Sequence, residues 1–241
     1  MVRVIFGGIM NKVGWIIFSV AVVALLGGLV AWTRITNPPI DVSNVENNTI
    51  LAASEQSGNI GDHTSGSDSK KIMFIEYGDF QCPSCEGAYP NVSSLLEEYG
   101  DKITFVFRNF PLTSIHPNAR AAAAVAEAAG LQGKFWEMYD ILYGRQGDWD
   151  SLDVSKRGDM FNTYAKELNL DVEKFKTDVA GPQVAKKINF DLALGKQYDV
   201  AATPSFFLNG EALDETTANG IVQGDLTSIK AKLDALIAEN K

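Results

Sequence analysis

The longest apolar stretch of the chain lies near its beginning and contains no charged residue. It covers residues 13–32 and reads VGWIIFSVAVVALLGGLVAW. As a helix it would rise about 30 Å, which is the thickness of the hydrocarbon core of a bilayer. The pattern therefore predicts a single transmembrane helix over residues 13–32, preceded by a short N-terminal segment over residues 1–12.

Basic residues lie mainly before this apolar stretch. Arg3 and Lys12 precede it, and only Arg34 follows before a long stretch without bases. Because positive charge stays on the cytoplasmic side of a membrane, we expect a cytoplasmic N-terminus, a single-pass protein of the cell membrane and an extracytoplasmic domain. A cleaved signal peptide is the alternative, although its apolar core is usually about 7 to 15 residues long.

Residues 33–69 are polar, rich in Asn, Ser, Gly and acidic side chains, and contain no aromatic residue. Such a composition is typical of segments that cannot bury a core of their own. We therefore expect a flexible linker over residues 33–69 and a folded domain over residues 70–241.

The folded domain begins with two apolar runs on either side of an amphipathic segment. The runs at 71–77 and 103–107 are rich in aromatic and β-branched residues and predict strands, whereas residues 82–99 predict a helix with Pro83 in its first turn. This order is typical of a right-handed parallel crossover, and it indicates an α/β domain.

Helical periodicity follows over residues 114–198 and predicts a helical insertion between strands. Its expected helices are at 117–129, 135–143, 156–169, 172–179 and 182–198.

A strand pattern returns at residues 205–208 and is followed by an Asn-Gly turn. This dipeptide favours a hairpin, and we expect its return strand near residues 220–222. An amphipathic helix capped by Asp225 and ending at residue 238 completes the domain.

The net charge and the hydrophobic content indicate a globular protein that does not bind nucleic acid. The net charge is -9, which argues against a nucleic-acid partner because phosphate backbones are bound by clustered Lys and Arg. The hydrophobic content of 46% is sufficient for a packed core.

Only two cysteines are present, Cys82 and Cys85, and they lie where the first strand passes into the helix. The N-terminal end of a helix favours an anion, so it stabilises the thiolate of Cys82, and Cys85 is placed to close a disulfide with it. Pro83 and Ser84 between them adjust how strongly the thiolate is stabilised. A zinc site would need four ligands, and the chain has only two His besides these cysteines. A redox pair is therefore favoured over inert buried thiols, with no metal and no cofactor.

Three ordered motifs then identify a family resemblance. Residues 75–85 (IEYGDFQCPSC), 107–112 (FRNFPL) and 202–210 (ATPSFFLNG) together resemble the DsbA-like thiol:disulfide oxidoreductases of the thioredoxin superfamily. The resemblance covers residues 70–241, and it implies a thioredoxin-like fold with a helical insertion.

The resemblance also implies roles for individual residues. Cys82 would be the solvent-facing, attacking cysteine and Cys85 its buried partner. Thr203 and Pro204 would form a substrate-contacting loop in which a cis proline lies against the disulfide. Glu76 would be a buried acid that accepts a proton from Cys85, although a strand acid that faces solvent remains the alternative.

By the same resemblance, the protein introduces disulfides into secreted or surface proteins. Its partners would be unfolded secreted substrates with thiols and a DsbB-like or VKOR-like membrane oxidase. The sequence has Ser84 where the best-known members have His, and Thr203 where some oxidases have Val. A reductase or isomerase fed by a membrane electron donor therefore remains an alternative, as does a non-catalytic, chaperone-like binding module.

Overall fold

The computed structural model describes residues 12–36, 40–67 and 71–240 of the chain. The described residues fall into two compact units, one ending at Ile40 and the other beginning at Asp41. The predicted N-terminal segment 1–12 lies outside the described residues except for Lys12, and so do residues 37–39 and 68–69 of the predicted linker.

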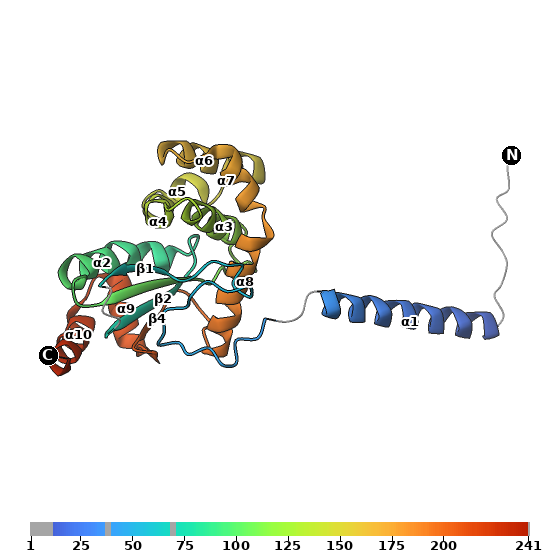
Figure 1. Cartoon of the computed structure of the whole chain (residues 1–241), viewed down its shortest axis with the longest axis horizontal. Helices are drawn as coiled ribbons and strands as arrows, with labels where there is room; N and C mark the ends of the chain where they lie inside the picture. Colours follow the sequence, from blue (N-terminus) through green and yellow to red (C-terminus); the bar gives the residue numbers. More distant parts are fainter. Residues whose placement is uncertain (1–11, 37–39, 68–70, 241) are drawn as a thin grey trace. The chain divides into compact units, whose positions relative to one another are not determined.

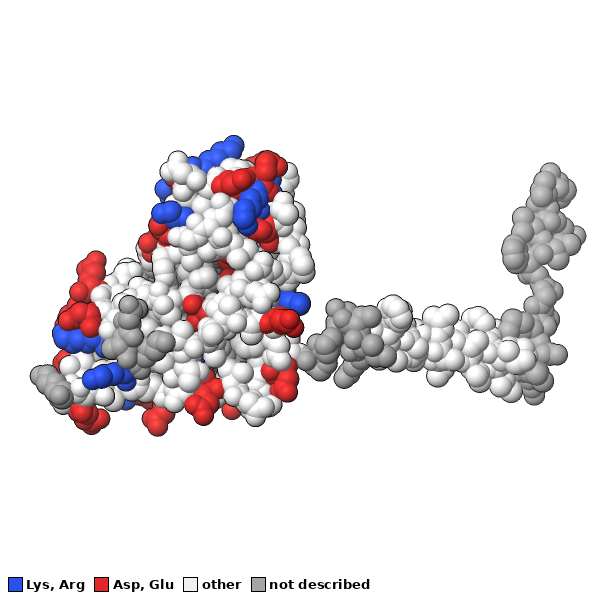
Figure 2. Space-filling view, in the orientation of Figure 1, with Lys and Arg blue, Asp and Glu red and all other residues white. Residues whose placement is uncertain are grey.

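The first unit contains one long helix, α1 (Lys12–Thr36). Its stretch Gly14–Thr33 has a mean hydropathy of 2.4 and is long and apolar enough to cross a membrane. Figure 2 shows this stretch without a Lys, Arg, Asp or Glu side chain. The helix predicted over residues 13–32 is therefore present, with the length and composition of a membrane span.

The second unit is built on a five-stranded sheet with the strand order β1-β3-β2-β4-β5. The central strand β2 pairs in parallel with β3 and antiparallel with β4, while β1 pairs antiparallel with the other edge of β3. The strands are β1 (His63–Gly66), β2 (Met73–Gly78), β3 (Thr104–Asn109), β4 (Ser205–Leu208) and β5 (Glu211–Ala212). All six residues of both β2 and β3 are buried, because helices cover both faces of a parallel pair.

Helix α2 (Pro83–Tyr99) connects β2 to β3 and confirms the predicted crossover. Its buried positions repeat at helical spacing, and they pack into the core cluster at Cys85, Ala88, Val92, Leu95 and Tyr99.

The helical insertion lies between β3 and β4, and Figure 1 shows α3 to α7 grouped together, apart from α9 and α10. Its helices are α3 (Ala119–Gly130), α4 (Phe135–Gly144), α5 (Gln146–Trp149), α6 (Val154–Glu167), α7 (Val172–Val179) and α8 (Pro182–Gln197). Five of them match the predicted helices within a few residues at each end, and the short α5 was not predicted.

The return strand of the hairpin is not where the sequence pattern placed it. It is β5, which directly follows the Asn209-Gly210 turn, and Gly210 has the positive φ of 89° that such turns require. Residues 220–222 instead belong to helix α9 (Glu215–Gln223), which Asp214 caps by accepting a hydrogen bond from the Thr217 amide. The final helix α10 (Thr227–Glu239) is present, but its N-cap position is Leu226 and not the predicted Asp225, whose carboxylate instead accepts a hydrogen bond from the Thr227 amide.

The prediction of a flexible linker over residues 33–69 is wrong for most of that range. Residues 33–36 extend helix α1, and residues from Asp41 onward belong to the compact domain, where strand β1 adds to the sheet beside β3. Asn47 is buried and accepts a hydrogen bond of 2.7 Å from the Tyr77 hydroxyl on β2. Polar contacts with residues distant in the sequence hold this segment, so its composition did not reveal its order.

The strongest of these contacts is a buried cluster of charges around Asp62. Its carboxylate lies 2.8 Å from Nη2 of Arg108 and 3.3 Å from Nζ of Lys187, which also lies 2.7 Å from Asp191. The charges of Arg108 and Lys187 outweigh the effect of burial and keep the pKa of Asp62 below its usual value. This cluster joins the N-terminal segment to β3 and α8.

Asp62→Asn is expected to destabilise the domain by about 3 to 5 kcal/mol, because it leaves the cations on β3 and α8 buried without full compensation. Chemical unfolding of the full-length protein in detergent measures this change. Asp101→Asn is the matched control, since Asp101 forms an exposed pair with Lys102 at 3.6 Å and should contribute less than about 1 kcal/mol. Equal effects of the two substitutions would contradict the assigned role of Asp62.

Candidate active site

The two cysteines lie at the start of α2, directly after the loop that leaves the central strand. Cys82 occupies the N-cap position of α2, and its carbonyl accepts the Cys85 amide at 3.1 Å. Both are free thiols. Cys82 retains 7% of its surface and Cys85 none, so Cys82 is the accessible sulfur but faces solvent less than expected.

The environment of Cys82 favours its thiolate. A hydrogen bond with the Cys85 side chain is the largest cause, and it lowers the pKa of Cys82 to about 5 against the opposing effect of burial. Hydrogen bonds from the Cys85 and Ser84 amides lower this pKa further. At neutral pH Cys82 is therefore ionised in the reduced protein, as a cysteine at a helix N-terminus should be.

Cys85 has the opposite character. Burial, the hydrogen bond with Cys82 and the negative charge of Glu76 raise the pKa of Cys85 well above its usual value. The Asp79 amide donates to its sulfur at 3.5 Å, which offsets these effects only in part. Cys85 is therefore a protonated thiol next to a thiolate.

The loop before β4 covers the Cys82 sulfur. The Thr203–Pro204 peptide bond is cis, as the family resemblance implies, and the Thr203 carbonyl oxygen lies 3.3 Å from Cys82 Sγ, where it can accept a hydrogen bond from the protonated thiol. The chain thus brings residues 121 positions apart in the sequence into direct contact. This contact explains why little of Cys82 is exposed.

Glu76 lies on β2 in the middle of the sheet, where it pairs with Phe107 on β3 and Phe206 on β4. Its side chain is buried, so the alternative of a strand acid facing solvent is wrong. Burial is the main cause that raises the pKa of Glu76 to about 8, and the negative charge of Cys82 adds to it. Near neutral pH this carboxyl is mostly protonated and close to ionising.

Pro83 and Ser84 are both exposed and occupy the first turn of α2. Pro83 has no amide hydrogen to donate, so the thiolate is stabilised by the amides of the next two residues. Neither side chain carries a positive charge near the sulfur.

Two further polar groups hold the active-site turn, and the sequence did not single out either of them as functional. Asp79 accepts hydrogen bonds from the Gln81 and Leu112 amides and lies 2.8 Å from Nδ1 of His116. Gln146, on α5 of the insertion, donates to the Phe80 and Cys82 carbonyls at 2.7 and 3.2 Å. No local pattern pairs residues this far apart, although the position of Asp79 directly after a strand agrees with its role in the turn.

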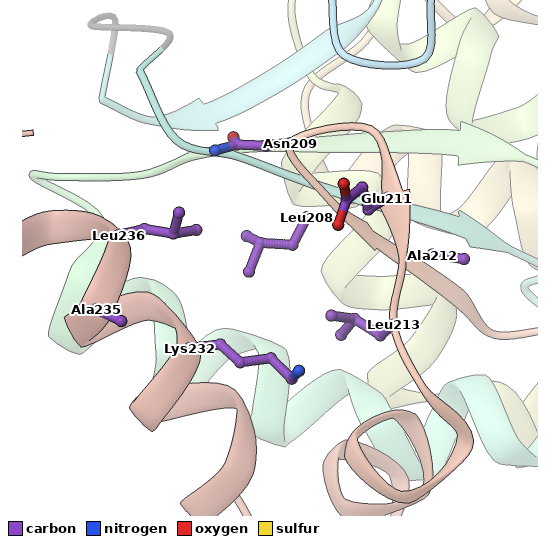
Figure 3. A pocket seen from close by; sticks show the side chains of 8 residues that line it. All are labelled: Leu208, Asn209, Glu211, Ala212, Leu213, Lys232, Ala235 and Leu236. Carbon is purple, nitrogen blue, oxygen red and sulfur yellow. The ribbon is translucent and has the colours of Figure 1, made fainter. Parts of the chain in front are cut away.

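A separate cavity of about 400 Å³ lies between the β4–β5 hairpin and α10 (Figure 3). Apolar side chains including Leu213 and Leu236 line it, together with the charged side chains of Glu211 and Lys232. Its lining includes neither cysteine nor Pro204, so it is not part of the cysteine site.

Comparison with solved structures places the fold in a known group. The structure of oxidised BdbD from Bacillus subtilis matches with a TM-score of 0.62 at 20% identity, covering 79% of this chain and 98% of that one. Alpha-DsbA1 from Wolbachia pipientis matches with a TM-score of 0.61 at 21% identity, covering 74% and 92% of the two chains. The thiol-disulfide oxidoreductase MdbA from Corynebacterium diphtheriae matches with a TM-score of 0.57 at 16% identity, covering 80% and 98%.

The curated sequences that match this chain are named as antiporters and not as oxidoreductases. The Na(+)/H(+) antiporter NhaA 1 of Salinispora arenicola is 40% identical over 62% of this chain, and the antiporter NhaA of Herminiimonas arsenicoxydans is 31% identical over 83%. The chain spans only 22% and 28% of the lengths of these two proteins. A family model described as thioredoxin matches residues 58–223, which include both cysteines and Pro204. The chain belongs to the thioredoxin family.

Proposed function

We propose that this protein is an extracytoplasmic thiol:disulfide oxidoreductase that introduces disulfides into secreted or surface proteins through the Cys82–Cys85 pair. The observation that carries the proposal is the contrast between the two thiols: Cys82 lies at the N-cap of α2 against the Thr203–Pro204 loop, with its pKa lowered to about 5, whereas Cys85 is fully buried and its pKa is raised. Stabilising the thiolate of the reduced form makes the disulfide form a stronger oxidant. This contrast favours an oxidase over a reductase.

The reaction proceeds by two exchanges of thiolate and disulfide. A client thiolate attacks Cys82 Sγ, so a client–Cys82 bond forms, the Cys82–Cys85 bond breaks and Cys85 leaves as a thiolate. The second client thiolate then attacks the client sulfur of the mixed disulfide and releases Cys82 as a stable thiolate. The client loses two electrons, and the cysteine pair gains them.

Glu76 serves the first exchange as a proton donor. The departing Cys85 thiolate is fully buried and needs a proton, and the neighbouring carboxyl with a pKa of about 8 holds one at neutral pH. Transfer of that proton leaves a Cys85 thiol and a Glu76 carboxylate. When the cysteine pair is reoxidised, the carboxylate takes the proton back from Cys85, as the family resemblance implies.

The loop at Thr203 and Pro204 contacts the substrate. This loop lies against Cys82, and its backbone carbonyl is within hydrogen-bonding distance of the reactive sulfur. An extended client segment that pairs with this loop would bring its cysteine to Cys82.

Reoxidation requires another protein, because the chain has no third cysteine. A DsbB-like or VKOR-like membrane oxidase would withdraw two electrons from the pair, while the single proton of Cys85 returns to Glu76. Helix α1 supports this assignment, since a membrane anchor would keep the domain near such a partner. The basic residues before α1 favour a cytoplasmic N-terminus, with the cysteines outside.

The curated relatives are named as sodium–proton antiporters, but this chain spans only about a quarter of their length. Ion transporters place their substrate sites between several membrane helices, and the described part of this chain contains one candidate span. The function proposed for the matched segment therefore rests on its thioredoxin family and its cysteine pair.

Oxidation of a reduced test protein measures the proposed activity. Oxidised full-length protein in detergent should form disulfides in a reduced, unfolded client much faster than the variant in which both cysteines are replaced by serine. Equal folding of the client with both proteins would identify a chaperone-like binding module instead.

A further inference from the structure

Three buried polar atoms below the cysteine pair have no hydrogen-bond partner among the described residues. They are Oε2 of Glu76 and the hydroxyl oxygens of Tyr139 and Tyr143 on α4 of the helical insertion. Buried polar groups are almost always paired with protein or with internal water. These three atoms therefore need a partner that the described side chains do not supply, and internal water is the usual one.

The two tyrosines and the carboxyl surround one phenylalanine. The ring centroids of Tyr139 and Tyr143 lie 4.9 Å from each other and 5.1 and 6.4 Å from that of Phe107. The Phe107 ring also reaches Gly78, where a Cβ atom would lie 2.3 Å from the ring and 3.0 Å from Oε1 of Glu76. A glycine at position 78 thus leaves room for the ring and the carboxyl to approach each other.

The charged groups of the site raise the pKa of both tyrosine hydroxyls. Burial is the main cause that raises the pKa of Tyr139 and of Tyr143 well above the usual value, and the negative charges of Glu76 and Cys85 add to it. Asp140 beside Tyr139 and Asp79 near Tyr143 act in the same direction. The two hydroxyls therefore stay protonated and can donate hydrogen bonds throughout the working pH range.

We propose that the hydroxyls of Tyr139 and Tyr143 donate hydrogen bonds, through buried water, to the Glu76 carboxylate after it has given its proton to Cys85. They act as positioning residues, because they stabilise the charge on Glu76 without touching the exchanging sulfurs. The inference rests on the proposed function and adds to it a role for the helical insertion in proton transfer.

The first exchange leaves a buried carboxylate that needs hydrogen-bond donors, and the two hydroxyls can supply them. Transfer from Glu76 to Cys85 moves a negative charge from sulfur to a carboxylate that the protein encloses completely. A carboxylate enclosed by apolar rings is costly unless hydrogen bonds reach it. Two neutral donors lower that cost and add no charge that would disturb the Cys82 thiolate.

The test compares the double variant Tyr139→Phe/Tyr143→Phe with the wild-type protein, both full-length, reduced and in detergent. Phenylalanine keeps the ring packing and removes only the hydroxyls. Carbon-13 NMR of the glutamate carboxyls follows the ionisation of Glu76, whose signal is identified by its loss in Glu76→Gln. Removing both donors should move the Glu76 midpoint upward by about one pH unit.

Tyr164→Phe is the matched control. Tyr164 on α6 is also buried with an unpartnered hydroxyl, but its pKa responds to burial and to Asp148, Arg145 and Glu167, and not to the cysteine site. This variant should leave the Glu76 midpoint unchanged. An unchanged midpoint in the double variant would overturn the inference, as would an equal shift in the Tyr164 control.

The NMR readout does not depend on disulfide exchange. If the protein fails to oxidise clients while the midpoint still moves, the proposed function is wrong but the hydrogen bonding to Glu76 stands. If client oxidation is observed and the midpoint does not move, only the role of the tyrosines is wrong.

Discussion

Replacing Cys85 by serine is expected to leave Cys82 joined to client cysteines in mixed disulfides that persist. The serine hydroxyl can still donate a hydrogen bond to the Cys82 sulfur, and the amides of residues 84 and 85 remain, so Cys82 stays mostly thiolate at pH 7. This thiolate attacks a client disulfide, so a client–Cys82 bond forms and the other client sulfur leaves as a thiolate. The variant lacks Cys85, the protein's own sulfur that would attack Cys82 and release a client whose second thiolate does not return. Non-reducing electrophoresis followed by mass spectrometry would detect these adducts in the native membrane.

Cys82→Ser provides the contrast. Its remaining sulfur, Cys85, is buried and has a raised pKa, so the variant should form no adducts and its client oxidation should fall to the uncatalysed level. Adducts on Cys85 in this variant would reverse the assigned roles of the two cysteines.

Glu76→Gln is expected to slow client oxidation by about a hundredfold near pH 7, because glutamine cannot supply the proton that Cys85 needs. The wild-type rate should fall as the pH rises through about 8, where Glu76 loses its proton, after allowance for client ionisation. The variant should lose this dependence. Stopped-flow fluorescence with a client peptide of known thiol pKa measures both effects, and a variant with wild-type rate and pH profile would exclude Glu76 from catalysis.

The same raised pKa predicts a change in stability with pH. Folding favours the protonated form of Glu76, whose pKa rises from 4.5 to about 8, so its contribution becomes unfavourable as the pH increases across this window. Glu76→Gln should therefore gain stability relative to the wild type between pH 5 and pH 9, by a few kcal/mol at most. Urea unfolding of the reduced proteins at both pH values checks the sign. A relative loss of stability at pH 9 would show that the carboxylate is better solvated than the structure indicates.

Local sequence patterns were sufficient for the parts of the site that lie close together in the chain. The apolar run before Cys82 and the amphipathic run after it predicted β2, α2 and the position of the thiolate at a helix N-terminus. The family resemblance supplied the loop at Thr203 and Pro204, which no periodicity could bring to Cys82. The burial of Glu76 also required knowledge of its neighbours, because an alternating strand can turn an acid toward either side.

The errors arose where distant polar contacts decide the structure. The sequence His63–Gly66 has no strand-like alternation, and β1 forms only because β3 offers it a free edge. The segment before it is ordered because Asp62 meets cations 46 and 125 residues away. The rings of Tyr139 and Tyr143 belong to the buried core, as helical periodicity allows, but that periodicity does not account for their unpartnered hydroxyls.

The reduction potential of the Cys82–Cys85 pair tests the central claim most directly. Equilibration of the full-length protein in glutathione buffers, with the thiolate absorbance of Cys82 as readout, gives this value. An oxidase with the stabilised thiolate described above should lie above about -200 mV, toward the range of strongly oxidising DsbA proteins. A value near about -270 mV, the range of thioredoxin, would contradict it and indicate a reductase.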